Sequence, residues 1–173
     1  MSDTRQIELP NPIPFDNTHD DFKLFKKLIK QQGDCVCRKK LSEKTVLGAI
    51  KRLEFGYISY GMKANIGQHI KNDNDKYLVY GFVLCHIEQD IIMHIDLLCI
   101  SCQYKGAGTD LMERVINHAQ NIGVSRITLY AIPELQKYYE KHGFDTVDTV
   151  RLSKDPKSEV KVYEMRRTLT HSV

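Results

Sequence analysis

The chain has 173 residues, of which 42% are hydrophobic and 27% charged, and these values fit one soluble globular domain rather than a disordered or fibrous protein. Its 25 basic and 22 acidic residues leave a net charge of +3, which is too small to argue for nucleic-acid binding. Because no apolar run reaches the roughly 18 residues of a membrane span and the N-terminus lacks a signal-peptide core, we expect one cytoplasmic domain, residues 1–173.

The first half of the chain predicts an extended lead-in, two helices and two strands. Residues 10–14 carry three prolines and disfavour helix. Apolar residues at helical spacing predict helices over residues 18–33 and 42–53, and Ser42 is the expected cap of the second. The apolar runs 57–64 and 77–87 predict strands.

The second half predicts an alternation of strands and helices. The run 91–100 is apolar at successive positions, which indicates a central strand covered on both faces. A glycine turn and a helix ending at Gly123 follow it. The remaining elements are predicted as strand 126–131, helix 133–143 and strands 144–150 and 160–169. This order indicates an α/β layered domain.

The glycine turn is the most informative segment, and it reads Gln103-Tyr104-Lys105-Gly106-Ala107-Gly108-Thr109. A strand, a tight turn and a helix in succession direct several backbone N–H groups to one point, where they can hold a phosphate or pyrophosphate. The segment lacks the Gly-Lys-Ser/Thr ending of a nucleotide P-loop. It also lacks the third glycine of the dinucleotide fingerprint, because position 111 is Leu.

Together with Tyr138-Tyr139-Glu140-Lys141-His142-Gly143-Phe144, this turn resembles the GNAT superfamily of acyl-CoA-dependent N-acetyltransferases over roughly residues 77–168. The resemblance implies a GNAT fold, an α/β domain whose mixed, mostly antiparallel central sheet is flanked by helices and has splayed central strands. It also implies acetyl-CoA as cosubstrate and coenzyme A as product. Either Gln103 or Lys105 could occupy the family's Gln/Arg position, and we favour Gln103 because the helix pattern then continues without a gap.

The family resemblance further assigns the residues that hold the coenzyme. Backbone amides of the glycine turn would bind the pyrophosphate, and the end of the preceding strand would pair with the pantetheine arm. The implied set is Leu98, Cys99, Ile100, Gln103, Tyr104, Lys105, Gly106, Ala107, Gly108 and Thr109.

Tyr139 is the candidate general acid, because it occupies the family position from which a phenol protonates the departing thiolate. The alternative is a core aromatic residue, which is the role we assign to Tyr138. His94 and Asp96 are the candidate general bases. They lie two apart on a predicted strand and should share one face beside Leu98 and Ile100; hydrogen-bonded core residues are the alternative for both.

The five cysteines are odd in number and lack a disulfide-framework spacing. Cys35 and Cys37 with Cys99 and Cys102 could form the two halves of a zinc site. We favour free cysteines that behave as small hydrophobic residues, since Cys85 and Cys99 lie in apolar strands. No metal is therefore predicted.

These observations predict an N-acetyltransferase that moves the acetyl group of acetyl-CoA to a primary amine by direct attack; an acetyl intermediate on Cys99 is the less favoured route. A small amine such as an amino sugar phosphate or a polyamine is the first choice of acceptor. A protein lysine or N-terminal amine is the alternative, and a catalytically inactive acyl-CoA sensor is the alternative of another class. No nucleic-acid or membrane partner is expected, and a homodimer through the last strands is possible.

Overall fold

The computed structural model describes residues 11–18, 20, 22, 23, 27, 43–62, 77–100, 106–151 and 161–170. In this part of the chain the strands are β1 (Ile13–Asp16), β2 (Phe55–Met62), β3 (Tyr77–Glu88), β4 (Ile92–Ile100), β5 (Arg126–Ala131), β6 (Asp145–Arg151) and β7 (Lys161–Thr168). The helices are α2 (Glu43–Arg52), α3 (Ala107–Asn121), the short 3₁₀ helix η4 (Pro133–Leu135) and α4 (Gln136–Lys141).

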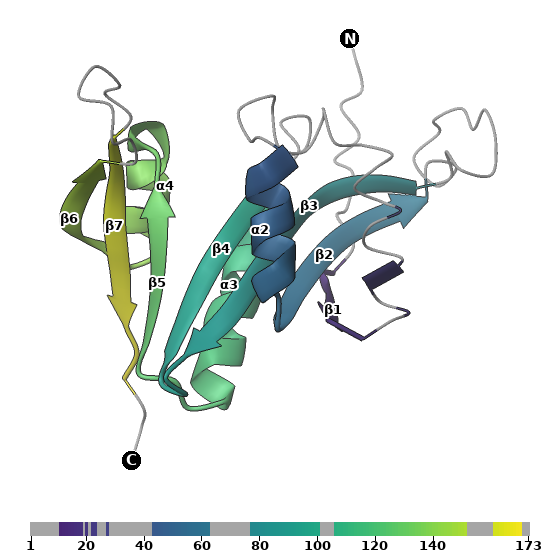
Figure 1. The fold of residues 1–173 in the computed structure, drawn as a ribbon, viewed down its shortest axis with the longest axis horizontal. Helices are drawn as coiled ribbons and strands as arrows, with labels where there is room; N and C mark the ends of the chain where they lie inside the picture. Colours follow the sequence, from purple (N-terminus) through teal and green to yellow (C-terminus); the bar gives the residue numbers. More distant parts are fainter. Residues whose placement is uncertain are drawn as a thin grey trace, which may run out of the picture.

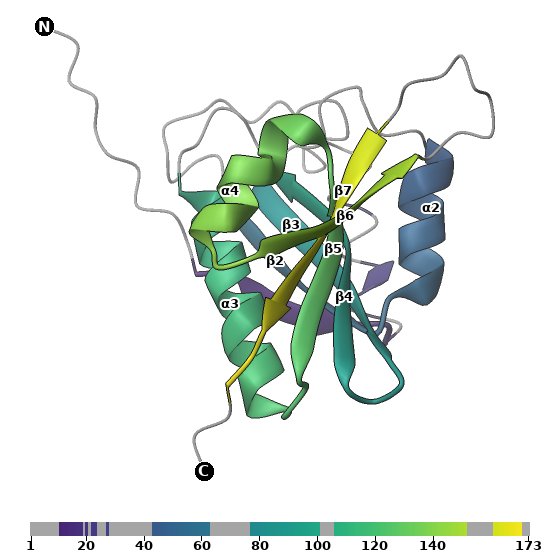
Figure 2. The same ribbon diagram turned by 90° about the vertical axis from the view of Figure 1, so that its left-hand side faces the viewer.

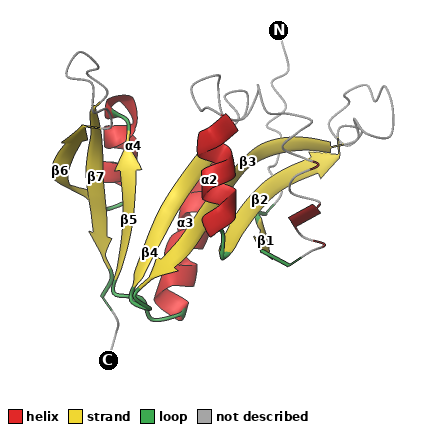
Figure 3. Ribbon diagram, viewed as in Figure 1, coloured by secondary structure: helices red, strands yellow, loops and turns green. Residues whose placement is uncertain are grey.

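The strands form one sheet in the order β1-β2-β3-β4-β5-β7-β6. Neighbouring strands are antiparallel except β4 and β5, which are parallel and are joined through α3. Helices α3 and α4 lie on one face of the sheet and α2 lies on the other (Figures 1 and 2). We call these the α3 face and the α2 face. The mixed, mostly antiparallel sheet between helices confirms the predicted fold class (Figure 3).

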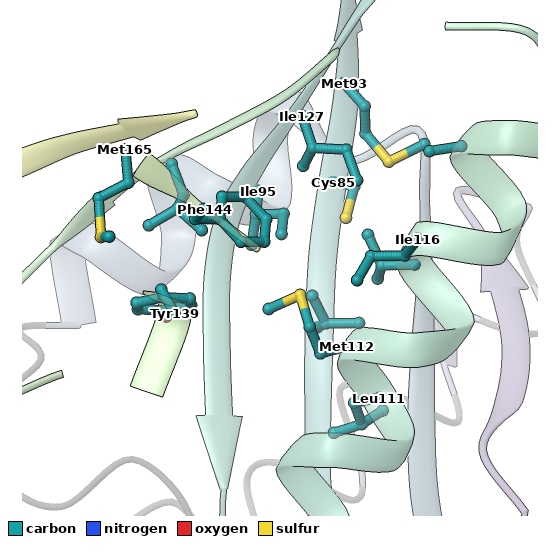
Figure 4. Packing of buried hydrophobic residues seen from close by; sticks show 14 of the residues in the cluster. Cys85, Met93, Ile95, Leu111, Met112, Ile116, Ile127, Tyr139, Phe144 and Met165 are labelled. Carbon is teal, nitrogen blue, oxygen red and sulfur yellow. The ribbon is translucent and has the colours of Figure 1, made fainter. Parts of the chain in front are cut away.

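Each face of the sheet has its own hydrophobic cluster. On the α3 face, side chains of α3 pack with those of the central strands and with Tyr139 and Phe144 (Figure 4). On the α2 face, Ala49 and Leu53 pack against Leu97 and Cys99 of β4. Because β4 contributes to both clusters, it is buried on both sides, as its continuous apolar pattern predicts.

The predicted helices and strands of the second half are present within a few residues of their expected ends. The helix expected over residues 133–143 begins as a 3₁₀ turn, and Gly123 takes a left-handed conformation (φ 78°) at the end of α3. The proline-rich lead-in contains an unpredicted strand, β1, which pairs with β2 at the edge of the sheet. Ser42 and most of the helix expected over residues 18–33 lie outside the described residues.

A β-bulge interrupts β4 at Asp96. Leu84 of β3 is opposite Leu97 and Cys85 is opposite Ile95, so Asp96 is an extra residue. The bulge reverses the alternation of side chains, and Leu98 therefore packs on the α3 face. The prediction that Leu98 and Ile100 share a face with His94 and Asp96 is wrong for this reason.

Strands β4 and β5 separate toward their C-terminal ends. Their pairing runs from Ile92–Arg126 to Ile95–Leu129, while β4 continues to Ile100 and β5 to Ala131. The two strands diverge visibly in Figure 1, which confirms the expected splay. The end of β4 still pairs with β3, but on its β5 side it presents backbone N–H and C=O groups with which an extended molecule between the strands could pair.

Candidate active site

The glycine turn leads into α3 through a left-handed glycine, and a second glycine lies close to neighbouring side chains. Gly106 has φ 99° and precedes the helix, and no described side chain caps its N-terminus. At Gly108 a Cβ atom would overlap Ile100 Cδ1 and lie 2.9 Å from the Tyr138 hydroxyl oxygen. The positive φ favours glycine at position 106, whereas a side chain at position 108 would force the ends of the Ile100 and Tyr138 side chains to shift. The first-turn amides are available to an anion.

Of the ten predicted coenzyme-binding residues, the structure describes seven. Ala107 and Gly108 are buried in the first turn of α3, and Thr109 is exposed beside them. Leu98 and Ile100 are partly buried and Cys99 is buried, all three on the part of β4 that has separated from β5. Gln103, Tyr104 and Lys105 lie outside the described residues.

The second motif folds as a tight helix end that places two aromatic rings in the core. Tyr139 is 6% exposed and lies 6.0 Å from the Phe144 ring, across the cluster from Met112 of α3 (Figure 4). Gly143 (φ 79°) reverses the chain between them, and the Arg167 guanidinium donates to the carbonyl oxygen of His142. Burial raises the pKa of Tyr139 to about 12, so the phenol stays protonated at neutral pH.

Asp96 is the centre of a hydrogen-bonded cluster on the α2 face. Its side chain is 2% exposed, and the two carboxylate oxygens lie 2.8 Å from Arg52 Nε and 2.5 Å from His86 Nδ1. The other ring nitrogen of His86 is 3.1 Å from Glu88 Oε1. Both oxygens of Asp96 are thus occupied by protein groups.

His94 lies beside this cluster and has a different hydrogen-bond partner. Its Nδ1 is 2.8 Å from Thr128 Oγ1, and its ring lies 5.3 Å from the His86 ring and 5.6 Å from the ring of Tyr130. Burial lowers the pKa of His94, although the Asp96 charge opposes this shift. The imidazole is therefore neutral at neutral pH, and its Nε2 has no hydrogen-bond partner among the described residues.

The pairing of neighbouring strands places His94 in a row of polar residues that crosses five strands on the α2 face. We call this set the polar row, and its members in order are His86, His94, Thr128, Arg166 and Asp145. His94 is the one member of this row that the sequence predicted as a site residue. The hairpin between the predicted strands 77–87 and 91–100 could have revealed His86, because the tight turn at Gln89 and Asp90 places it opposite His94.

Two other expectations concern cysteines and metals. Cys85 is free and buried, as expected, whereas Cys99 is disulfide-bonded and the expectation of a free thiol there is wrong. Within the described ranges, no group of three or more His, Cys, Asp or Glu side chains could hold a metal ion. No helix in the same ranges is long and apolar enough to span a membrane.

The fold and motifs agree with a family model. The model of the acetyltransferase (GNAT) domain matches residues 43–166, well over half of the chain. This protein therefore belongs to the GNAT acetyltransferases, and acetyl-CoA is its cosubstrate. A search of the curated proteins finds no match.

Solved structures with the same fold span nearly the whole chain. The ribosomal-protein-S18-alanine N-acetyltransferase of Escherichia coli has a TM-score of 0.62 at 14% identity, covering 94% of this chain and 96% of that one. A GNAT family acetyltransferase from Elizabethkingia anophelis with acetyl-CoA bound has a TM-score of 0.60 at 14% identity, with coverage of 92% and 99%. Arabidopsis thaliana Naa50, bound to the bisubstrate analogue CoA-Ac-MVNAL, has a TM-score of 0.60 at 16% identity, with coverage of 92% and 100%.

Proposed function

We propose that this protein transfers the acetyl group of acetyl-CoA directly to a primary amine, with Tyr139 as general acid and His94 as general base. One observation carries the proposal. The two residues lie on opposite faces of the sheet, Tyr139 on the α3 face and His94 on the α2 face, and His94 is in the last but one residue pair before β4 and β5 separate. A thioester between the strands would have a proton donor on one side and a proton acceptor on the other.

The reaction needs both groups. An alkyl ammonium has a pKa near 10.4, so the acceptor must lose a proton before its nitrogen can attack the thioester carbon. The tetrahedral intermediate then breaks its C–S bond, and the thiolate takes a proton. His94 is neutral and can accept the first proton, directly or through a water. Tyr139 is protonated and can supply the second.

His94 is a better candidate base than Asp96. Asp96 is nearly inaccessible, and its oxygens are engaged by Arg52 and His86. Its role in this proposal is structural, because it fixes His86 and links α2 to the bulge in β4. His94 is held by Thr128 through Nδ1, which leaves Nε2 available for the acceptor.

The donor side follows from the splayed strand and the glycine turn. We propose that a backbone N–H near Cys99 or Ile100 polarises the thioester carbonyl, as an oxyanion hole does. The first-turn amides of α3, from Gly106 to Thr109, would hold the pyrophosphate. We favour direct transfer over an acetyl-cysteine intermediate because the Cys99 side chain is buried in the hydrophobic cluster on the α2 face.

The acceptor remains a small amine in this proposal, such as an amino sugar phosphate or a polyamine. A protein amine is the second candidate. It is supported by two of the structural neighbours, one named as a ribosomal-protein-S18-alanine acetyltransferase and one bound to a peptide-containing bisubstrate analogue. A homodimer through β7 and a cytoplasmic location are further proposals.

The deciding experiment measures free-thiol release from acetyl-CoA with three acceptors: glucosamine 6-phosphate, spermidine and a lysine peptide. Acceptor-dependent release that falls about tenfold or more in His94→Gln supports amine acetylation with His94 as base, and the most active arm names the acceptor class. Binding of acetyl-CoA without thiol release in all three arms would favour the sensor alternative.

A further inference from the structure

Tyr138 carries an unexplained polar atom. The residue is partly buried, its hydroxyl oxygen is buried, and that oxygen has no hydrogen-bond partner among the described residues. A buried hydroxyl without a partner costs roughly 1–3 kcal/mol, so such atoms are rare in folded proteins and each calls for a physical explanation. The sequence alone indicated only a core aromatic residue at this position.

The hydroxyl lies against the first turn of α3. A Cβ atom at position 108 would be 2.9 Å from it, which makes Gly108 its close neighbour. The same glycine touches Ile100, the last residue of β4. The Tyr138 hydroxyl therefore lies where the strand that separates from β5 meets the uncapped N-terminus of α3.

The ring of Tyr138 is held in place on both sides. It makes edge-on contacts with Tyr139 at 5.1 Å and with His142 at 4.9 Å between ring centroids. Burial, with a smaller contribution from Tyr139, raises the pKa of Tyr138. The hydroxyl is thus a fixed, protonated donor at neutral pH, in contact with the turn that binds the cosubstrate in this family.

We propose that the Tyr138 hydroxyl donates a hydrogen bond to acetyl-CoA where the cosubstrate passes the first turn of α3. The two adjacent tyrosines then have separate roles. Tyr138 binds the cosubstrate, and Tyr139 faces the chemistry. This inference rests on acetyl-CoA as the cosubstrate and is independent of the acceptor and of the identity of the base.

The test compares Tyr138→Phe with the wild type by isothermal titration with coenzyme A and by thermal unfolding. Phe keeps the ring contacts and removes only the hydroxyl. We expect the dissociation constant to rise about tenfold, as for one lost hydrogen bond. Without ligand, the unfolding midpoint should stay the same or rise, because an unpaired buried hydroxyl is gone.

Tyr139→Phe is the matched control, since it removes the neighbouring hydroxyl from the same helix. Its dissociation constant should stay within about twofold of the wild type. In steady-state kinetics, Tyr138→Phe should raise the KM for acetyl-CoA and leave kcat nearly unchanged. An unchanged dissociation constant in Tyr138→Phe overturns the inference, and so does a weaker affinity accompanied by an equal loss of stability without ligand. The isothermal titration and the thermal unfolding measurement do not depend on acetyl transfer, so they test this inference even if the proposed reaction is wrong.

Discussion

The two faces of the sheet differ in how their side chains interact. On the α3 face the side chains form one continuous apolar cluster, and its tyrosines pack by ring contacts. On the α2 face the polar row crosses five strands, and only part of it is paired: His86 is fixed by Asp96 and His94 by Thr128. Arg166, farther along the row, has a buried Nε with no partner in the described part of the chain.

This difference suggests a division of labour between the faces. An apolar cluster fixes geometry, which suits the binding of a cosubstrate common to a whole family. A row of partly paired polar groups has hydrogen-bonding capacity left for a ligand, which suits the binding of an acceptor. If the faces divide donor from acceptor in this way, substitutions on each should produce a different kinetic signature.

The largest expected effect is that of Tyr139→Phe on the α3 face. If Tyr139 is the general acid, its loss should lower kcat by about 100-fold or more, because general acid catalysis is typically worth 10²–10⁴-fold. Coenzyme A binding should be nearly unchanged. The measurement is kcat with the best acceptor of the panel, and an unchanged kcat would remove Tyr139 from the mechanism.

His94→Gln on the α2 face should have the next largest effect, a loss of roughly tenfold to 100-fold in kcat/KM. The pKa of His94 is lowered by burial, so activity should be present at neutral pH and fall as the pH drops below the ordinary histidine value of 6.5. His94→Gln should lack this acidic limb. The control is Asp96→Asn, which should lose stability yet keep the fall in activity at acidic pH. If this fall disappears in Asp96→Asn and persists in His94→Gln, then Asp96 is the base and His94 has the structural role.

The smallest expected effect concerns the turn that supports Tyr139. Gly143→Ala forces a side chain into a left-handed conformation and places its Cβ 3.0 Å from Arg167 Nη1. We expect a loss of about 2 kcal/mol in the free energy of unfolding. Gly123→Ala has the same backbone strain with open space around it, and should cost about 1 kcal/mol. Equal losses in urea denaturation would show that Arg167 simply moves aside.

Much of the fold could be predicted because the residues within and next to each helix or strand indicate where it begins and ends. Apolar periodicity and the stop signals at Gly123 and Gly143 define α3 and α4 within a few residues. Strand β1 was missed because a proline-rich segment resembles an irregular lead-in. Proline is tolerated on an edge strand, where one side of the backbone has no partner, so composition does not distinguish the two cases.

The candidate site could be proposed from the sequence to the extent that it lies in contiguous motifs. The turn at Gly106 and Gly108 and the segment around Tyr139 are read directly from neighbouring residues. The polar row joins residues from 86 to 166, and only strand register brings them together. The role of Asp96 depends on a single extra residue in β4, which is defined by the pairing partner and has no sequence signal of its own.

That extra residue has a consequence for how relatives of this chain should be aligned. Before Asp96, even-numbered positions of β4 belong to the α2 face; after it, Leu97 and Cys99 take that place and the even positions change sides. An alignment that treats β4 as a regular strand will assign the residues after Asp96 to the wrong face of the sheet. The numbering of β4 carries functional information only when it is counted separately on each side of Asp96.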